Sequence, residues 1–527
     1  MIFTGLVTIL AFLFCIFLSG LSLLRYGTVD FTVFSEKITL VRQSGAAVVI
    51  GLFVAVLVSV FLQYYLFSRS ETEKKKIYHR TGTVSFCLIF LLGFIWIHTN
   101  PCPPVADPLV VWDSARCLAA GITDTPEFAF YNTYLQVYPF QKGLILFCAG
   151  LIRLFGAHPQ HSFQLLNALC AGLIVLLLAR IARNLARDSA AGILVHLLGL
   201  LFVPLVLFTP FVYGTLLSYT CLLAGFDAAL VLRSILPALP LKGKARWRCL
   251  YIIPAVVLPA LACQLYTSAW IGVIAIVLFF LVSAFFQYAK KLHGIVPLIA
   301  LAVLVPLLTL SLQYAVQEGF HRLTGLPAGG GTPASTYLYM GISSTNGVAG
   351  PGSHNGSDIG MFSDNGMDPE ATDEEALAAI RETMDAYANG ARSYSFFVEK
   401  AEYQWLDPWF SSVQLTIHPD MIPDTAPPRF TFLLESGLLP ALEKMLSVLL
   451  PVIYLGALFG IIVIVKKREA AYSSLLLLLY FAGGFTFQFF WEAKARYCLP
   501  FFLILFPFAA AAFSFAGHWV AVRFHSQ

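Results

Sequence analysis

Two aspartates, Asp107 and Asp113, follow closely on a long apolar run that ends near His98. A carboxylate placed where a chain leaves an apolar environment can accept a proton from the hydroxyl of a sugar or a lipid. The same residues also suit two simpler roles, a solvated acid in a loop or a cap at the start of a helix. The spacing makes Asp107 and Asp113 candidate general bases and leaves the structural alternatives open.

A second candidate group lies near the C-terminus, in the sequence WEAKARYCLP at 491–500. Glu492, Lys494 and Arg496 stand together there between two apolar runs. Arginine binds phosphate oxygens through two parallel hydrogen bonds, and lysine adds a point charge. The two cations are therefore candidates for binding a lipid phosphate. The alternative is that they extend towards ordinary anionic headgroups.

Aromatic and amide side chains form the third candidate group. Tyr138, Pro139 and Gln141 stand at the start of an apolar run, where an amide beside an aromatic ring suits the binding of sugar hydroxyls. Trp405 lies in YQWLDPWF, and its indole ring could stack on a carbohydrate. Tyr138 and Trp405 are equally well explained as aromatic residues that anchor a helix at a membrane surface.

The composition assigns the chain to the membrane proteins. Of 527 residues, 58% are hydrophobic and only 12% are charged, whereas soluble domains contain about 25% charged residues. About thirteen apolar segments are candidates for spans of roughly 20 residues: 2–24, 45–68, 82–98, 141–156, 164–184, 190–210, 213–236, 249–265, 267–288, 294–314, 436–465, 472–490 and 498–520. The predicted fold is an all-α polytopic membrane protein with about 12–13 transmembrane helices. Because segment 141–156 is short and carries Arg153, we expect it not to cross separately, which favours twelve crossings.

Positively charged residues concentrate in short connections between the apolar segments, a pattern typical of cytoplasmic loops. The clusters are Lys74–Lys76 with Arg80, Arg180–Arg187, Lys242–Arg248, Lys290–Lys291 and Lys466–Arg468. This asymmetry places segments 99–140 and 315–435 outside and predicts a multi-pass protein of the cell membrane with an extracytoplasmic functional face. The net charge is only +4, and no basic cluster accompanies a nucleic-acid-binding motif.

Composition also divides the chain into four parts. Residues 1–80 are expected to form an N-terminal transmembrane pair, and 81–314 a transmembrane core that includes the first outside loop at 99–140. Residues 315–435 form an extracytoplasmic loop, and 436–527 the C-terminal transmembrane helices. We expect interfacial helices in the first outside loop and a mixed, partly helical cap from the second.

One amphipathic helix can be placed within that cap. Thr372 with Glu375 forms a capping-box pattern. Apolar residues then follow at helical spacing until Asn389-Gly390 stops the run. The pattern predicts an ordered cap rather than a disordered linker.

Cysteine and histidine spacing does not indicate a metal site. No CxxC pair or Cys/His ligand spacing occurs. His158 and His161 lie three residues apart, but Pro159 between them indicates a loop. Cys102 and Cys117 share the first outside loop, where a disulfide is an open alternative because sequence separation does not fix their distance.

Several stretches, in their order and spacing, resemble the multi-span C-type (GT-C) glycosyltransferases, the superfamily of the protein O-mannosyltransferases and the lipid A aminoarabinose transferase. More narrowly, they are similar to uncharacterised family-39-like membrane proteins of Gram-positive bacteria. The stretches are ADPLVVWDSARCLAAG at 106–121, YPFQKGLILFCAGLIRLFG at 138–156, FQLLN at 163–167, FVYG at 211–214, YMGIS at 339–343, FFVEKAEYQWLDP at 396–408 and WEAKARYCLP at 491–500. The resemblance extends from about Asp107 to Ala511, and the two spans before residue 80 look like an addition.

The resemblance implies roles for individual residues. The acid that relatives keep in the first outside loop falls best on Asp107, with Asp113 second. Many relatives have two adjacent acids there, and in this chain Pro108 takes the second place. The family's late Arg-Tyr pair falls on Arg496 and Tyr497.

With Lys494, those two residues would bind the donor phosphate. Tyr213 of FVYG joins Tyr138, Gln141 and Trp405 as a candidate for substrate binding.

The resemblance also implies an enzyme, an inverting glycosyltransferase that depends on a polyprenyl-phosphate sugar. Its partners would be that lipid-linked sugar, membrane lipids and a cell-envelope glycan, lipid or protein that supplies the acceptor hydroxyl, with no nucleic acid. Asp107 would take the hydroxyl proton, and Lys494 with Arg496 would stabilise the departing phosphate. No nucleotide-binding pattern or certain cofactor is present in the sequence, and a divalent cation is an open alternative.

Two other classes of protein are alternatives to a transferase. A transporter or flippase for lipid-linked glycans would place charges within spans and show repeated halves. Asp227 is the clearest charge within a span, and no repeat is visible. A non-catalytic envelope-assembly protein is the third class, and it would tolerate the loss of Asp107.

Overall fold

The computed structural model describes residues 2–33, 35–123, 133–159, 162–236, 250–289, 294–325, 330–418, 421–422, 426–466 and 468–525. The basic clusters expected at Lys242–Arg248 and Lys290–Lys291, and His161 of the histidine pair, lie outside these residues.

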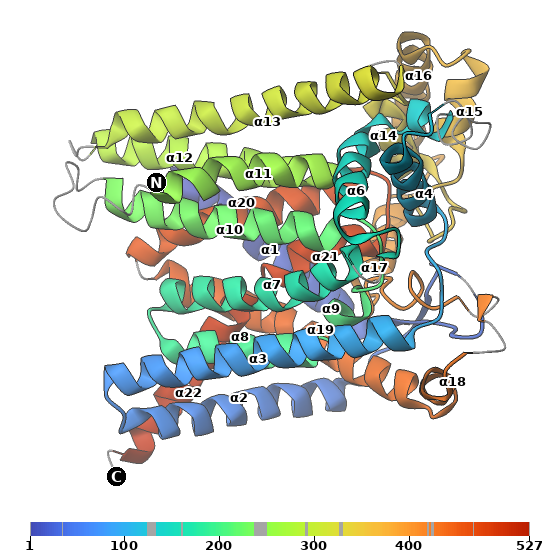
Figure 1. Ribbon diagram of the computed structural model, residues 1–527. Coiled ribbons are helices and arrows are strands. Elements are labelled where there is room, and N and C mark those ends of the chain that lie inside the picture. The colour runs from blue at the N-terminus through green and yellow to red at the C-terminus, as the bar shows by residue number, and fades with distance from the viewer. Residues whose placement is uncertain are drawn as a thin grey trace.

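The body of the molecule is a bundle of long helices that lie side by side (Figure 1). They are α1 (Ile2–Leu24), α2 (Gly45–Phe67), α3 (Glu71–Thr99), α7 (Phe163–Ala186), α8 (Ser189–Leu201), α10 (Thr215–Ile235), α11 (Ile252–Leu265), α12 (Trp270–Ala289), α13 (Ile295–Thr324), α19 (Leu438–Val465), α20 (Arg468–Phe490), α21 (Ala495–Leu503) and α22 (Phe506–His525). Two short elements, α9 (Pro204–Leu207) and the 3-10 turn η5 (Thr267–Ala269), connect helices of this bundle.

In the part of the chain that the structure describes, nine helices are long and apolar enough to cross a membrane. The pair α21–α22, bent by 43°, makes a tenth if it is one span, and α8 and α11 are shorter apolar helices. The prediction of an all-α polytopic membrane protein is confirmed. The count reaches twelve, the lower end of the expected range, only when the bent pair and both shorter helices are included.

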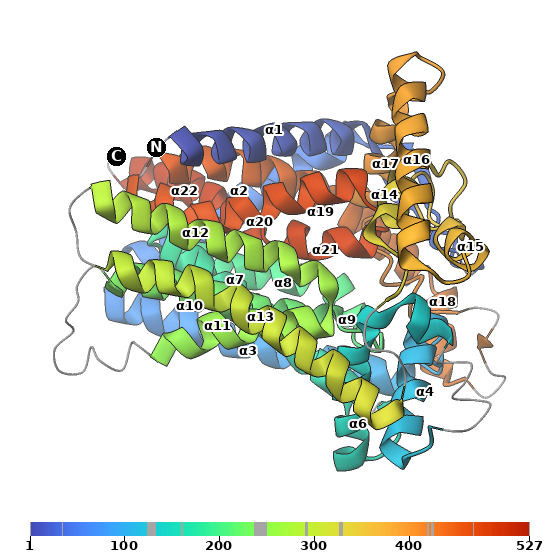
Figure 2. The same ribbon diagram turned by 90° about the horizontal axis from the view of Figure 1, so that it is seen from above.

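One end of the bundle carries most of the remaining structure (Figures 1 and 2). It consists of β1 (Arg25–Thr28), β2 (Thr39–Arg42), α4 (Asp107–Ala120), η1 (Pro139–Gln141), α6 (Lys142–Phe155), α14 (Ala334–Ser343), α15 (Ser357–Asp364), α16 (Pro369–Ala388), α17 (Ser395–Trp405) and α18 (Pro428–Glu435). We call this end the cap. The described termini of the chain lie at the opposite end of the bundle.

The segment 141–156, which we expect from the sequence not to cross the membrane separately, forms α6. This helix lies across the end of the bundle beside α4 (Figure 1), with Lys142 in its first turn and Arg153 in its last. Arg153 donates hydrogen bonds to the carbonyls of Leu118 and Ala119 in the last turn of α4. Arg153, the charged residue that interrupts this apolar run in the sequence, thus holds α6 against α4.

The predicted amphipathic helix of the cap is α16, but its start differs from the expectation. The cap residue is Asp368, whose side chain accepts a hydrogen bond from the amide of Glu370 at 2.9 Å. Pro369 occupies the first helical position, which suits proline because that amide has no helical partner. Thr372 lies within the helix and donates to the carbonyl of Asp368.

The two N-terminal helices pack against the C-terminal ones. Helix α1 lies along α19 and α20, and α2 lies along α22 (Figure 2). Between them, β1 and β2 pair as an antiparallel hairpin whose connecting residues reach the cap end. The N-terminal pair therefore delivers a loop to the same end as α4 and α21.

We predict that the cap faces the outside of the cell, because Lys74–Lys76 and Arg183–Arg187 lie at the other end. A cysteine introduced at Ser363, which is exposed in α15, should react with a membrane-impermeant thiol reagent on intact cells. One introduced at Thr72, which is exposed at the start of α3, should react only after permeabilisation. Labelling in the reverse sense would contradict this orientation, and the unmodified protein gives the background from its native cysteines.

Candidate functional site

The guanidinium of Arg496 lies at the centre of a charged cluster beneath the cap. The residue lies in the first turn of α21 and is 4% exposed. Its Nη1 atom lies 3.4 Å from Oε2 of Glu36, and its Nη2 atom lies 4.0 Å from Oδ2 of Asp107. The rings of Phe211 and Tyr497 lie 5.8 and 5.3 Å from the guanidinium carbon, within range of cation–π attraction.

One donor of this guanidinium is unused. Among the described residues, no hydrogen-bond acceptor reaches the buried Nε of Arg496. A buried donor without a partner costs about 1–3 kcal/mol, so such groups are rare in folded proteins. The unused Nε donor, beside Nη1 bonded at 3.4 Å to Glu36, is the kind of group that a further acceptor with several oxygens, such as a phosphate, can bind.

Asp107 reaches this position from the first turn of α4. The residue before it, Ala106, has φ 53° and ψ −134°, a conformation that non-glycine residues rarely adopt and that costs about 1–3 kcal/mol. Oδ1 of Asp107 accepts a hydrogen bond from the hydroxyl of Tyr134 at 3.1 Å, while Oδ2 faces Arg496. The strained turn thus aims a helix-N-terminal carboxylate at the guanidinium.

Three more charged groups complete the site, which we call the Arg496 cluster: Arg496, Asp107, Glu36, Lys494 and Glu492. The ammonium of Lys494 lies 3.9 Å from Glu36 and 3.7 Å from Glu492. Burial acts to raise the pKa of Glu36, but Lys494 and Arg496 outweigh it and lower that pKa overall. For Glu492 burial dominates, and its pKa is raised despite Lys494. Glu36 therefore keeps its charge more firmly than Glu492 does.

Aromatic and amide side chains line the cluster on the bundle side. The amide of Gln141 donates a hydrogen bond to the hydroxyl of Tyr213. The ring of Tyr266 lies 5.8 Å from that of Tyr213 and 6.4 Å from that of Tyr497. Two of the predicted substrate-binding residues, Gln141 and Tyr213, are thus in direct contact and lie beside the predicted donor-binding Tyr497.

A carboxylate–histidine pair lies on the cap side. Asp358 of α15 is buried, with its two oxygens 3.2 Å from Nε2 of His354 and 3.0 Å from the hydroxyl of Tyr138. The hydrogen bond to Asp358 raises the pKa of His354, and the field of this histidine reaches Glu36 and Glu492. The third predicted substrate-binding residue, Tyr138, therefore joins the start of η1 to α15 through a carboxylate that the sequence did not single out.

Two predicted residues do not join the cluster. Asp113 lies farther along α4 and pairs with Arg116 at 3.0 Å, one helical turn away. Trp405 is 1% exposed, and its ring packs on Phe481 and Phe485. A ring enclosed in this way offers no face for a sugar, so in this structure Trp405 belongs to the core of the protein.

Cys102 and Cys117 are not joined to each other by a disulfide.

Sequence reasoning missed Glu36, His354, Asp358 and Lys400. Glu36 lies 460 residues from Arg496 in the sequence, in a short polar stretch without a motif, and nothing in the pattern links the two. Lys400 did carry a signal, since a lysine within the apolar–aromatic stretch FFVEKAEYQW needs buried acceptors.

Lys400 fixes the backbone that leads into the cluster. Its side chain is fully buried, and its ammonium donates to the carbonyls of Gly341, Phe489 and Trp491 at 2.6, 3.1 and 2.6 Å. Burial lowers the pKa of Lys400 to about 7. This one side chain connects α14 and α17 of the cap to the end of α20, immediately before Glu492.

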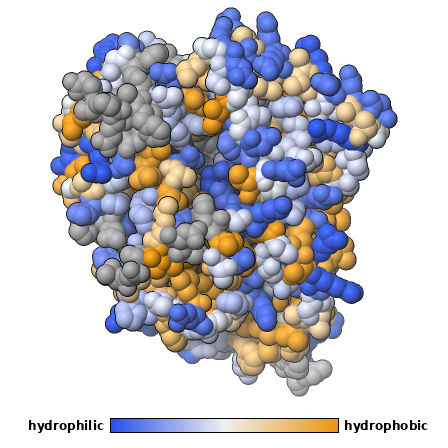
Figure 3. All heavy atoms as spheres, turned by 90° about the vertical axis from the view of Figure 1, so that its right-hand side faces the viewer, coloured by the Kyte–Doolittle hydropathy of each residue, from blue (hydrophilic) through white to orange (hydrophobic). Residues whose placement is uncertain are grey.

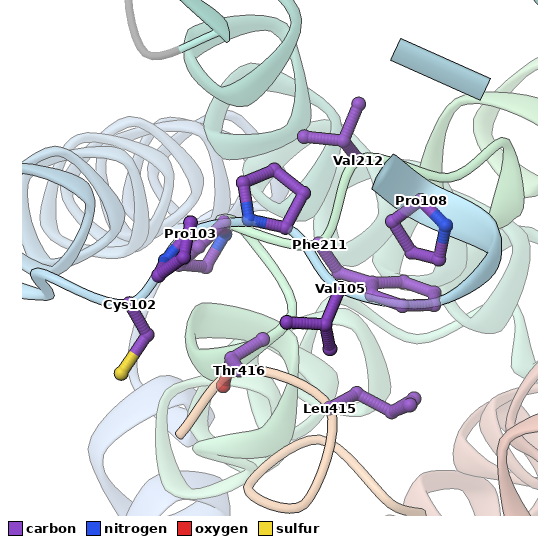
Figure 4. A pocket seen from close by; sticks show the side chains of 10 residues that line it. Cys102, Pro103, Val105, Pro108, Phe211, Val212, Leu415 and Thr416 are labelled. Atoms are coloured by element: carbon purple, nitrogen blue, oxygen red, sulfur yellow. The ribbon is translucent and has the colours of Figure 1, made fainter. Parts of the chain in front are cut away.

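A small recess lies behind the loop that carries Asp107 (Figure 4). It is lined by Pro103, Val105 and Pro108 of that loop and by Phe211, Val212 and Thr416 from two other segments. Its volume of about 10 Å³ is near that needed for one water molecule. Apolar packing of this kind holds the strained turn at Ala106 in place.

No group of three or more His, Cys, Asp or Glu side chains in the described ranges is placed to hold a metal ion. The carboxylates of the Arg496 cluster are each directed at a cation or a hydroxyl of the protein.

Comparisons with known proteins assign no family. No family model and no curated protein sequence matches the chain. Among solved structures, the chain is similar to the archaeal oligosaccharyltransferase AglB from Archaeoglobus fulgidus, solved in complex with an inhibitory peptide and a dolichol-phosphate. The TM-score is 0.39 and the sequence identity 12%, over 82% of this chain and 50% of that one. The chain thus spans half the length of that structure, and a likeness at this level is too weak to assign an activity.

We predict that Lys400→Met strongly destabilises the protein. Methionine fills a similar volume but leaves three buried carbonyls without a donor, at about 1–3 kcal/mol for each unsatisfied group. The expected loss is about 3 kcal/mol or more, seen as a large fall in Tm of the purified protein. Lys444→Met is the matched control, because Lys444 is exposed and should tolerate the change. Equal Tm values for the two variants would contradict the role of Lys400.

Proposed function

We propose that this protein is an inverting glycosyltransferase that moves a sugar from a polyprenyl-phosphate donor to an acceptor hydroxyl at the outer face of the membrane. The observation that carries the proposal is the buried guanidinium of Arg496, which has a donor without a partner and lies 4.0 Å from the half-exposed carboxylate of Asp107. A phosphate receptor beside a candidate base provides the two functions that transfer from a lipid phosphate needs.

The cluster suits a leaving phosphate better than a permanently bound one. Two cations and three carboxylates share the site, and burial raises the pKa of Glu492. The charges of Lys494 and Arg496 are thus nearly balanced by carboxylates of the protein itself. An arriving phosphate would displace Glu36 from Arg496 and take its place as an anion of similar geometry. Near-balance of this kind permits exchange of the ligand after reaction.

The reaction follows from these positions. Asp107 accepts the proton of the acceptor hydroxyl, and the resulting oxygen attacks the anomeric carbon on the face opposite the phosphate. The new glycosidic C–O bond forms as the bond between the anomeric carbon and the phosphate oxygen breaks, with the electron pair passing to the phosphate. Arg496 and Lys494 stabilise that charge as it develops. Substrate must separate Asp107 from Arg496, since the two lie in direct contact at rest.

The position of the site suits a polar acceptor and an apolar donor tail. The cap end of the molecule is covered largely by hydrophilic residues (Figure 3), as expected for a surface in contact with water. The Arg496 cluster lies between this cap and apolar helices long enough to cross a membrane. A lipid phosphate at headgroup level would reach the cluster with its chain among those helices, while the acceptor would approach from the cap.

The structure offers less support for a transporter. Asp227, the acid that lies most clearly within a span, is buried in α10 and pairs with Arg180 of α7 at 3.1 Å. A pair between adjacent helices neutralises both charges and serves helix packing. It does not mark a pathway for a polar substrate.

The test is a comparison of Asp107→Asn with Asp113→Asn in the purified protein in liposomes, given a panel of polyprenyl-phosphate sugars. Loss of general-base help costs about 10²–10⁴ in rate, so Asp107→Asn should release polyprenyl phosphate that much more slowly than wild type. Asp113→Asn should stay near the wild-type rate, because Asp113 pairs with Arg116 outside the cluster.

The two variants together show which aspartate, if either, is the base. An inactive Asp113→Asn beside an active Asp107→Asn would move the base to Asp113. Activity in both would exclude both aspartates as the base, and no release of polyprenyl phosphate by the wild type with any donor would contradict the transferase. Asparagine preserves the shape of each side chain, so donor binding should survive in both and serves as the measure of correct folding.

A further inference from the structure

A second site lies at the end of the bundle opposite the Arg496 cluster. A cavity of about 710 Å³ opens there among the start of α3, the turn between α7 and α8, the end of α19 and the middle of α22. Ligand-binding pockets typically measure about 300–1,000 Å³. Helix α3 has 29 residues and rises about 1.5 Å per residue, so roughly 40 Å separates its two ends. The cavity therefore belongs to a different site.

The cavity carries an excess of positive charge. Four cations line it, and two carboxylates do: Lys74, Lys75, Arg183 and Arg187 against Glu71 and Asp188. These six side chains leave an excess of two positive charges. Glu71 accepts a hydrogen bond from Lys74 at 2.7 Å, so its charge is already engaged within the cavity wall.

The floor of the cavity is a fixed polar network. Asp188 accepts from the amide of Gln63 at 2.8 Å and from the hydroxyl of Ser514, and it also caps the start of α8. Gln63 donates to Ser514 as well. This network connects α2, α8 and α22, and it occupies the oxygens of Asp188, the second of the two acids that line the cavity. The cationic side chains therefore line a cavity in which Asp188 is held by hydrogen bonds from neutral groups.

The wall on the other side is apolar. Val463 and Ile464 at the end of α19 and Phe515 on α22 line the same cavity, and Phe515 is 53% exposed on the bundle surface. A cavity with cations at its mouth and apolar side chains beside them matches an amphiphile whose charged group lies at headgroup level. Basic pockets between transmembrane helices bind phosphate-bearing headgroups for this reason.

We propose that this cavity binds a phosphate-bearing anion, supplied by the headgroup of an anionic lipid or by a soluble phosphate. Lys75 and Arg187, both exposed at its mouth, provide charge for the phosphate, and Phe515 with the end of α19 accommodates the hydrocarbon part of a lipid. The site does not depend on the proposed transferase activity, since no residue of the Arg496 cluster contributes to it.

The experiment measures Tm of the purified full-length protein in a neutral detergent. Phosphatidylglycerol is compared with phosphatidylcholine, and inorganic phosphate with chloride at equal ionic strength. The double variant Lys75→Gln with Arg187→Gln is tested against Lys76→Gln with Arg80→Gln. The control pair removes the same charge from exposed positions on α3 that do not line the cavity.

Phosphatidylglycerol should raise Tm more than phosphatidylcholine does, and the cavity variant should lose at least half of that difference while the control variant keeps it. A rise with inorganic phosphate that is lost in the same variant identifies a soluble anion as the ligand. No preference for either phosphate source would overturn the proposal. Equal losses in the two double variants would also overturn it, because they would indicate surface charge alone. Single Lys75→Gln against single Lys76→Gln repeats the comparison if the double variant does not fold.

Discussion

The buried guanidinium of Arg496 is the interaction on which the rest of the cap end depends. A charge removed from water is stable only when opposite charges and hydrogen-bond acceptors surround it. Those groups come from parts of the chain far apart in sequence: Glu36 from the N-terminal hairpin, Asp107 from the first turn of α4, and Phe211 from the loop before α10. The strained turn at Ala106 and the triple anchor of Lys400 both serve to keep this arrangement assembled.

The guanidinium of Arg496 has opposite charges beside it but not all of the hydrogen-bond acceptors that it can use. Glu36 and Asp107 place opposite charge beside Arg496, yet its Nε finds no acceptor among the described residues. Two single-point contacts from carboxylates at 3.4 and 4.0 Å are weaker than the paired hydrogen bonds that a guanidinium forms with one phosphate. We therefore propose that a phosphate binds this guanidinium more strongly than either carboxylate does. That would leave one carboxylate as the base and the other as a counter-charge that the phosphate displaces.

The membrane fold could be predicted from the sequence because apolar length and the absence of charge are local properties. The same holds for α16, whose helical spacing lies within one segment, and for the short run that became α6, where Arg153 marked the end of the apolar stretch. The sequence indicates Asp107 because it follows an apolar span, and it indicates Arg496 because it is a cation between two apolar spans. Their contact with each other was not predictable from spacing.

The rest of the site depends on contacts between distant segments. Glu36 has no motif, and its role appears only when α1 and α2 pack against the C-terminal helices and bring their hairpin to the cap. Trp405 is predicted from the sequence to be a binding residue and is not one in this structure. Its sequence context suggests an exposed ring that could stack on a sugar, but tertiary packing encloses the ring against Phe481 and Phe485. Side-chain burial is decided by the partner element, which a single segment does not reveal.

The most direct test of the account is the affinity for polyprenyl phosphate of the wild type and of Arg496→Lys, both in nanodiscs. Lysine keeps the positive charge but removes the Nε donor and the planar pair of hydrogen bonds. A hydrogen bond to a charged group contributes about 1.5–3 kcal/mol, so the account predicts that Kd rises by roughly tenfold or more. An unchanged Kd in Arg496→Lys would show that Arg496 supplies no more than charge, and would contradict the assignment of its guanidinium as the phosphate receptor.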